Sequence, residues 1–243
     1  VQQYHDEGYF ILESVLSEAQ LEGLRSEAQR YIDMMHEEMD RQATDTLGIS
    51  HRDKRYFVSL KHEESKLISE FLFSPLMEEV TRSVLEDNVY LFYEQYVIKA
   101  AEKGMHFGWH QDSGYVGEGH KPYLTCWITL DDMTEENGTV YILPYDRAGT
   151  REYVHHQQEE KTNDKIGYDG DDPGIPVIVP AGSIACFSST TFHRSTTNTT
   201  PNMRRVYLAQ YSSAPIYKPD APDELFGLAA PFIQNGERVT STV

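Results

Sequence analysis

Cysteine is scarce in this sequence: Cys126 and Cys186 are the only two among 243 residues. Neither belongs to a Cys-x-x-Cys pair, and both stand in apolar, strand-like segments. We therefore interpret them as small core residues rather than as metal ligands or a disulfide. A chain without structural disulfides is typical of a reducing compartment, and we expect a cytoplasmic protein.

Long hydrophobic runs and an excess of basic charge are also missing. No apolar run approaches the ~18 residues of a transmembrane helix, and no secretory hydrophobic segment stands near Val1. Lysine and arginine number 21 against 39 aspartate and glutamate residues, for a formal net charge of −18. Because phosphates bind to a basic face, this charge argues against broad binding to nucleic acid. The sequence predicts neither a membrane nor a nucleic-acid partner, and its acidity serves mainly solubility.

The residue pattern changes from helical to strand-like near residue 88. Before it, Ser17 with Gln20 matches a capping box, and Ser74 before Pro75 matches an N-cap with proline in the first turn. Apolar residues then recur at helical spacing, so two helices are predicted, in SEAQLEGLRSEAQRYIDMM and SPLMEEVTRSVLED. Segments rich in aromatic and β-branched residues follow and predict strands. They are NVYLFYEQYVIKAA, YLTCWITL, TVYILP, IPVIVP, SIACFSST and RRVYLAQY.

Short strands with turns between them, and no helices separating them, predict an antiparallel sandwich or barrel. We expect an α+β fold in a single domain over residues 1–243, mostly helical over 1–87 and β over 88–243. The Asn-Gly pair between TLDDMTEE and TVYILP predicts the tight turn of a hairpin. Residues 147–175 are polar and predict a long loop, of a length often found in lids and binding loops.

The stretch FGWHQDSGY sets His110 and Asp112 two positions apart. This spacing is weak evidence by itself, because HDE, HRD and HEE elsewhere in the chain match it too. Most of those matches lie in the predicted helical part, where residues two apart face different sides. In an extended segment they face the same side, so His110 and Asp112 can converge on one metal ion.

A third ligand for such an ion stands in STTFHRSTTNTTPNMRRVYLAQY, where His193 ends an apolar strand. Two histidines and a carboxylate on one face form the triad of non-heme Fe(II) oxygenases, which leaves room for a bidentate cosubstrate and for O2. A cosubstrate such as 2-oxoglutarate carries a second carboxylate, and the guanidinium of Arg204 is a suitable partner for it. Ser195 lies on the same strand face as His193 and could donate its hydroxyl to that carboxylate. Arg205 is a rival for the role of Arg204.

Over nearly its whole length the sequence resembles the phytanoyl-CoA dioxygenase family of Fe(II)/2-oxoglutarate oxygenases. The metal motif and the central hairpin are the most specific parts of this resemblance. The matching segments are YHDEGYFILESVLSEAQLEGL, FSPLMEEVTRSVLEDNVYLFY, WHQDSGY, CWITLDDMTEENGTVYILP and FHRSTTNTTPNMRRVYLAQY. The resemblance implies a double-stranded β-helix, a cupin-like jelly roll with the N-terminal helices packed outside.

The resemblance also implies the roles of individual residues and the cofactors Fe(II), 2-oxoglutarate and O2. The iron ligands implied are His110, Asp112 and His193. The residues implied for 2-oxoglutarate are Arg204, Ser195, Trp127 and Gln95. Lys54 or Arg55 falls where some family members use a basic residue.

The implied reaction is hydroxylation of a small molecule with release of succinate and CO2. Related halogenases carry a small residue where this chain has Asp112, so hydroxylation or another oxygen-driven C–H oxidation is expected. The sequence does not choose among hydroxylation, desaturation, ring closure and epimerisation. One departure from the family bears on the substrate: Pro-Gly-Ser-His is usual after the hairpin, whereas this chain has Pro144-Tyr145-Asp146-Arg147.

The substrate is open at this point. An acyl-CoA follows from the family name, but a chain of charge −18 without a basic patch does not favour that anion. The predicted loop offers aromatic and acidic side chains that suit a polar, even cationic, small molecule, and a merely solvated loop is an equal alternative. These side chains are Tyr153, His155, His156, Tyr168, Asp169, Asp171 and Asp172. A cupin-like isomerase or dioxygenase that does not use 2-oxoglutarate, and a non-catalytic jelly-roll binding protein, remain as other function classes.

Overall fold

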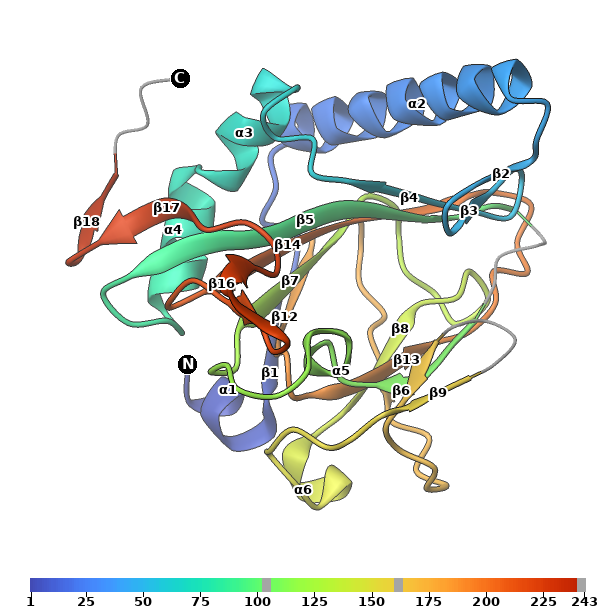
Figure 1. Cartoon of the computed structure of the whole chain (residues 1–243). Coiled ribbons are helices and arrows are strands. Elements are labelled where there is room, and N and C mark those ends of the chain that lie inside the picture. Colours follow the sequence, from blue (N-terminus) through green and yellow to red (C-terminus); the bar gives the residue numbers. More distant parts are fainter. Residues whose placement is uncertain (102–105, 160–163, 240–243) are drawn as a thin grey trace.

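Two antiparallel β-sheets and a set of outer helices make up the protein, seen in a computed structural model that describes residues 1–101, 106–159 and 164–239. Figure 1 shows the longest helix lying across the outside of the larger sheet. The helices are α1 (Gln2–Glu7), α2 (Glu18–Arg41), α3 (Lys66–Leu72), α4 (Pro75–Arg82), α5 (Ser113–Val116) and α6 (Tyr145–Ala148).

The larger sheet contains β1 (Tyr9–Leu12), β2 (Thr46–Leu47), β3 (Ser50–His51), β4 (Arg55–Ser59), β5 (Val89–Lys99), β7 (Leu124–Thr129), β12 (Ile184–Ser188), β14 (Arg204–Ser212), β17 (Ala230–Gln234) and β18 (Glu237–Arg238). Its order is β1-β12-β7-β14-β5-β4-β3-β2, and β17 pairs with both β5 and β18. The smaller sheet contains β6 (Phe107–His110), β8 (Val140–Leu143), β11 (Ile175–Pro176) and β13 (Phe192–Ser195), in the order β11-β8-β13-β6.

The chain alternates between these two sheets, because β6 and β8 lie in the smaller one and β7 between them lies in the larger one. Two facing antiparallel sheets that exchange strands in this way form a double-stranded β-helix, or jelly roll. The expected α+β fold with helices packed outside is therefore confirmed. Two short ladders belong to neither sheet: β9 (Gln157–Gln158) with β10 (Lys165–Ile166), and β15 (Tyr217–Lys218) with β16 (Ala221–Leu225).

The side-chain alternation of β5 separates the helical layer from the interior of the jelly roll. Tyr96 and Ile98 are fully buried against the helices, and the Tyr96 hydroxyl donates to the carbonyl of Leu24 on α2 at 3.1 Å. Because successive strand residues face opposite sides, Gln95 and Val97 point between the two sheets instead.

Helix α2 begins at the predicted capping box, with both of its hydrogen bonds present, and α4 begins at Ser74 as expected.

The hairpin predicted at Asn137-Gly138 is wrong. Strand β7 before it pairs with β12 and β14, whereas β8 after it pairs with β11 and β13. A tight turn does form: the backbone N–H of Thr134 donates to Asn137 Oδ1 at 3.0 Å, and Gly138 has a φ of 77°. The turn carries the chain from one sheet to the other, and turn chemistry alone does not say which strands will pair.

The N-terminal third contains strands that the sequence did not predict, besides its helices. Strands β1 and β4 come from before residue 88 and join the larger sheet, and His51 lies in β3 rather than on a helix. Short apolar segments such as YFIL and RYFVS lack the length for a helical period, so their pairing depends on the sheet that they complete. The predicted loop 147–175 is interrupted by α6, β9 and β10 where it is described.

The two cysteines lie opposite one another on β7 and β12. They are buried and not joined in a disulfide, which confirms that they are small core residues. Among the helices formed by the described ranges, none is long and apolar enough to cross a membrane.

Candidate active site

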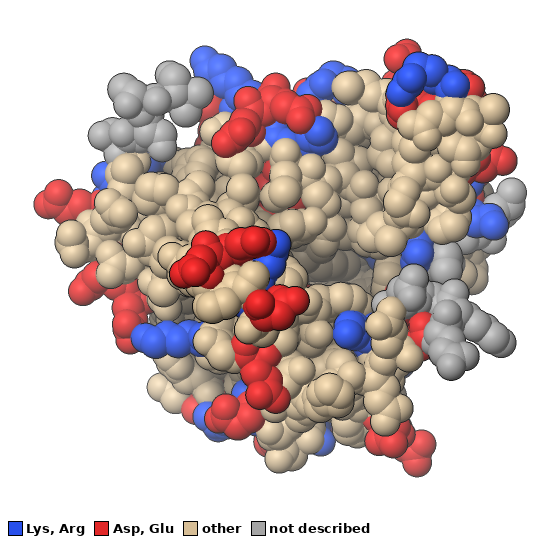
Figure 2. Space-filling view, viewed as in Figure 1, with Lys and Arg blue, Asp and Glu red and all other residues tan. Residues whose placement is uncertain are grey.

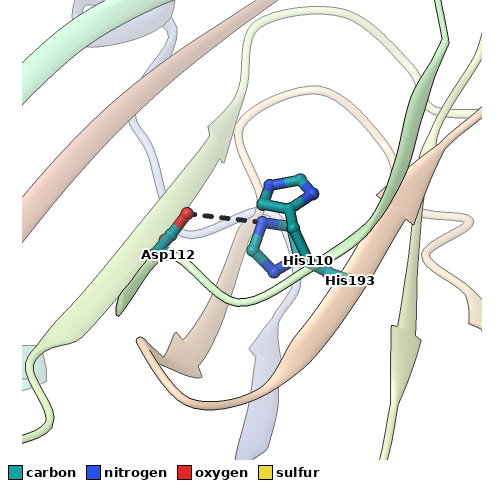
Figure 3. A group of neighbouring side chains, drawn as sticks. All are labelled: His110, Asp112 and His193. Atoms are coloured by element: carbon teal, nitrogen blue, oxygen red, sulfur yellow. Dashed lines mark ion pairs between the residues drawn. The ribbon is translucent and has the colours of Figure 1, made fainter. Parts of the chain in front are cut away.

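Two histidines and an aspartate converge at one end of the smaller sheet, between the two sheets. His110 ends β6 and His193 lies on β13, where the antiparallel ladder sets the two residues directly opposite. Asp112 follows at the start of α5, so the chain turns after His110 instead of continuing as the expected strand. One ligand atom from each residue lies within 4.8 Å of the others, a separation that a single metal ion can bridge. Figure 3 shows the imidazole of His193 directed at the carboxylate, with 3.5 Å between Nε2 and Oδ1.

Both imidazoles are held in one orientation by backbone carbonyls. Nδ1 of His110 lies 2.8 Å from the carbonyl oxygen of Gly108, and Nδ1 of His193 lies 3.1 Å from that of Thr191. A ring nitrogen that donates to a carbonyl leaves the other nitrogen unprotonated in the neutral ring. Nε2 of each histidine is therefore available as a metal ligand. Burial, together with the neighbouring His193, lowers the pKa of His110 well below its ordinary value, which keeps that ring neutral.

The carboxylate of Asp112 is held from the larger sheet. Its Oδ2 accepts a hydrogen bond from the Thr125 hydroxyl at 2.5 Å and another from the amide nitrogen Nε2 of Gln210 at 3.0 Å. These donors stand on β7 and β14 and are partners in the ladder. Because Oδ2 is occupied in this way, Oδ1 is the oxygen presented to the histidines. Within the described ranges no other three His, Cys, Asp or Glu residues form such a group.

Gln111, between two of these residues, points away from them. Its amide nitrogen donates to the carbonyls of Glu152 and Thr190 at 2.9 and 2.7 Å. Its backbone N–H donates to Nε2 of buried His156 at 2.9 Å. These bonds fix the backbone that joins His110 to Asp112.

Arg204 is a buried cation with unsatisfied donors. It is 2% exposed, and its Nη2 donates to the carbonyl of Gly138 at 3.0 Å, while Nε and Nη1 have no partner among the residues that the structure describes. Burial lowers the pKa of Arg204 to about 10, so the guanidinium is still charged at neutral pH. Its carbon Cζ lies 5.7 Å from the ring centroid of Trp127. Buried charged donors are normally paired, so two vacant N–H groups on one guanidinium favour an anionic ligand.

Arg205, the rival to Arg204, faces the other side of the sheet. Its Nε and Nη2 donate to the two carboxylate oxygens of Asp131 at 3.1 and 2.6 Å. It does not line the cavity described below. The alternation of β14 therefore separates a paired surface arginine from an unpaired internal one.

Lys99, which sequence reasoning missed, lies beside Arg204. The two residues are opposite in the β5–β14 ladder, and Lys99 is 1% exposed. Its ammonium donates to the Ser195 hydroxyl oxygen at 2.8 Å and to the Thr196 carbonyl. Burial and the charge of Arg204 lower the pKa of Lys99 well below its ordinary value. A lysine near the end of the apolar run YVIKAA was the available signal, since a charged side chain in a buried strand needs partners.

All seven residues predicted for the site line one cavity of about 380 Å³ between the sheets. They are His110, Asp112, His193, Arg204, Ser195, Trp127 and Gln95. Arg55 also lines it, and Lys54 does not. The face of the molecule shown in Figure 2 is hollowed near its centre.

The loop residues that suggested a polar or cationic substrate do not line this cavity. From the described part of residues 147–175, only Asp164 reaches its wall. Tyr153, His155, His156, Tyr168, Asp169, Asp171 and Asp172 lie elsewhere. Side chains of a loop that is read as one segment can face solvent, pack inward or support a neighbour, and the sequence does not distinguish these cases.

Comparison with known proteins gives a family match over most of the chain. The family model for phytanoyl-CoA dioxygenase (PhyH) matches residues 4–206. Ectoine dioxygenase from Bordetella bronchiseptica is 24% identical over 237 residues, covering 88% of this chain and 74% of that protein. L-proline trans-4-hydroxylase from Streptomyces griseoviridis is 25% identical over 173 residues, covering 62% and 65%. Among solved structures, EctD from S. alaskensis with 2-oxoglutarate and 5-hydroxyectoine has a TM-score of 0.71 at 19% identity, covering 98% of this chain and 86% of that one.

Proposed function

Because this chain belongs to the phytanoyl-CoA dioxygenase family and is a non-heme Fe(II)- and 2-oxoglutarate-dependent dioxygenase, we propose that His110, Asp112 and His193 bind its iron. The observation that carries this assignment is the presence, in one cavity, of this three-residue group and a buried arginine with two unpaired donors. Two neutral imidazoles and a carboxylate are the donor set that suits Fe(II) with open positions.

Arg204 would bind the distal carboxylate of 2-oxoglutarate through its vacant Nε and Nη1, assisted by the hydroxyl of Ser195. The β5–β14 ladder supports this orientation of 2-oxoglutarate. Arg204 stands at the Lys99 end of β14, whereas Gln210, near the other end, bonds to Asp112. Leu208 lies between them, with Trp127 and Gln95 as its ladder partners on either side. A dicarboxylate that spans from Arg204 to the metal group would therefore pass Trp127 and Gln95.

With iron, 2-oxoglutarate and O2 bound, such a site supplies the oxidant that hydroxylates a C–H bond and releases succinate and CO2. The chain's own contribution is orientation and exclusion of water. Backbone carbonyls fix both imidazoles, Thr125 and Gln210 fix the carboxylate, and the sheet walls close the cavity around them. The substrate would be a small molecule, in line with the names of the relatives.

The two other function classes fit the cavity less well. A cupin-like enzyme that does not use 2-oxoglutarate would have no need of Arg204. A non-catalytic binding protein would have no need of two histidines and a carboxylate grouped around one point. Anaerobic addition of Fe(II) and then 2-oxoglutarate tests all three. Chelation should produce a weak visible charge-transfer band. Iron binding without the band would support the cupin-like class, and no metal binding would support the non-catalytic one.

Replacing Gln210 by leucine should weaken metal binding without abolishing it. The change removes one of the two donors to Asp112 Oδ2 and leaves Thr125 in place. Loss of such an outer hydrogen bond typically costs about 10- to 100-fold in metal affinity. The measurement is an anaerobic Fe(II) titration, with Gln20→Leu as a control on the exposed N-terminus of α2. Unchanged affinity in Gln210→Leu would mean that the carboxylate needs no support from β14.

Replacing Lys99 by methionine should weaken 2-oxoglutarate binding selectively. Lys99 donates to Ser195 Oγ, so the Ser195 hydroxyl hydrogen is left to donate elsewhere, toward the cavity. Without the ammonium, Ser195 loses this orientation and the site loses a positive charge beside Arg204. We expect the 2-oxoglutarate midpoint of the visible band to rise about tenfold or more, as for loss of a charged hydrogen bond.

Oxalate provides the control for Lys99→Met, because it chelates the metal but has no distal carboxylate. Its inhibition constant should stay within about twofold of the wild-type value. Equal weakening of oxalate and 2-oxoglutarate would show that Lys99 supports the fold of the site rather than the distal carboxylate.

A further inference from the structure

The end of the cavity away from Arg204 is walled by aromatic rings. We call this wall the aromatic end, and it consists of Phe92, Tyr93, Tyr115, Tyr123 and Phe226. These rings come from four separate segments: β5, α5, the residues just before β7 and the residue after β16. The apolar side chain of Val116 lies among them.

The ladder between β5 and β14 fixes where this wall lies relative to the metal group. Tyr93 is the partner of Gln210, whose amide bonds to Asp112, whereas Lys99 is the partner of Arg204. The aromatic end therefore begins where the metal group is and continues away from the proposed 2-oxoglutarate position. The ring of Tyr115 lies 5.5 Å from that of His110, centroid to centroid.

A β-bulge explains how two consecutive residues share this wall. In the β5–β14 ladder the register shifts after the pair Gln210–Tyr93. The next residue of β14, Tyr211, pairs with Leu91, which leaves Phe92 of β5 without a partner in this ladder. An extra residue in one strand turns its neighbours toward the same side. Phe92 and Tyr93 can thus both line the cavity, although regular alternation would place them on opposite faces.

Four of the rings pack against one another as a continuous wall, and the fifth, Tyr115, packs against His110. Ring centroids lie 4.8 Å apart for Phe92 and Tyr123, 6.2 Å for Phe92 and Phe226, and 6.5 Å for Phe92 and Tyr93. A cage for a quaternary ammonium instead surrounds the cation with ring faces. A continuous aromatic wall offers offset or edge contacts to another ring. Tyr115 and Phe226 are 43% and 37% exposed, so the wall reaches the surface, as at a ligand entrance.

Charged groups of the cavity reach this wall at Tyr115, which interacts electrostatically with Asp164, Asp112 and Arg55. The arginines that line the cavity are Arg55 on β4, Arg194 on β13 and Arg204. Its carboxylates are Asp112, in the metal group, and Asp164. In the described part of the chain, the aromatic end itself contains no cation to bind a substrate carboxylate and no anion to bind an amine.

We propose that the aromatic end binds the substrate of the reaction, and that this substrate is an uncharged molecule with a planar or fused ring. The proposal rests on the proposed function, because the metal group would then act on a C–H bond of the ring or of a group attached to it. The cavity is at the small end of the ~300–1,000 Å³ usual for small-molecule sites. It would hold one or two fused rings beside the cosubstrate, with any larger part extending past Tyr115 and Phe226.

The experiment begins with the anaerobic Fe(II)–2-oxoglutarate protein, whose visible band must form before any probe is added. We then add 2-naphthol as an uncharged fused ring, choline as a quaternary ammonium, or free proline as a zwitterion. The proposal expects 2-naphthol to shift the band at the lowest concentration. Equilibrium dialysis of 2-naphthol against the metal-free protein measures its binding independently of the band.

Phe226→Ala and Tyr93→Ala should each raise the Kd for 2-naphthol about fivefold or more, with the 2-oxoglutarate midpoint unchanged. Ile178→Ala is the matched control, an apolar side chain that is 51% exposed and does not line the cavity. A band that forms but responds only to choline or proline overturns the proposal. So does binding of 2-naphthol that neither variant changes. A band that never forms, with dialysis still dependent on Phe226, contradicts the proposed function and leaves the ring-binding wall supported.

Discussion

Replacing His193 by alanine should abolish both metal-dependent 2-oxoglutarate binding and turnover. The change removes one of two nitrogen ligands from a three-residue group and leaves Asp112 facing only His110. Fe(II) affinity should fall by at least ~100-fold, the upper range for changes in the shell outside the ligands. The measurements are an anaerobic Fe(II) titration and 2-oxoglutarate-dependent O2 consumption, which should drop below detection.

His155→Ala is the control for this variant, since His155 is exposed and does not line the cavity. It should retain wild-type iron affinity. A thermal melt of metal-free His193→Ala separates loss of the ligand from loss of the fold. If correctly folded His193→Ala bound Fe(II) and formed the visible band as wild type does, the proposed ligand set would be wrong.

Replacing Arg204 by methionine should raise the 2-oxoglutarate requirement by about 100-fold or more. The variant keeps most of the side-chain length but removes Nε and Nη1, the donors without a protein partner. Two charge-assisted hydrogen bonds of ~1.5–3 kcal/mol each account for a change of this size. The measurement is the 2-oxoglutarate midpoint of the visible band at saturating Fe(II), whose own affinity should change little.

Arg205→Met is a closely matched control, because it changes the next residue of the same strand. Arg205 is paired with Asp131 outside the cavity, so its loss should leave the 2-oxoglutarate midpoint within about twofold of wild type. Equal effects of the two variants would show that the general charge of β14, rather than the vacant donors of Arg204, governs the cosubstrate.

The sequence predicted those parts of the site that depend on local pattern. The strand-like context of FGWH and TFHRS indicated that His110 and His193 belong to a sheet. In the structure the two residues lie opposite one another on the paired strands β6 and β13. The helix starts at Ser17 and Ser74 were predicted for the same reason, since capping involves residues three apart. Arg204 was distinguished from Arg205 only by resemblance to the family, and strand alternation provides the physical reason.

Other parts of the site depend on contacts between residues far apart in sequence. Gln210 and Thr125 reach Asp112 only because β14 and β7 are neighbours in the larger sheet, and nothing near Asp112 indicates that order. Lys99 was missed for the same reason, since its partner Ser195 lies on β13 of the smaller sheet, far from Lys99 in sequence. Phe226 joins the aromatic end from beyond β16. These pairings follow from topology, which a single sequence specifies weakly.

Strands β5 and β14 carry the two proposed binding positions at opposite ends of their length. Lys99 and Arg204 stand at one end, and Tyr93 and Gln210 stand near the other. Residues this far apart, without shared partners, change binding nearly independently of one another. A lineage with this architecture can therefore replace the rings around Tyr93 and acquire new substrates while its cosubstrate chemistry stays intact. The fold thus separates the inherited reaction from the part of the molecule on which selection for new specificity can act.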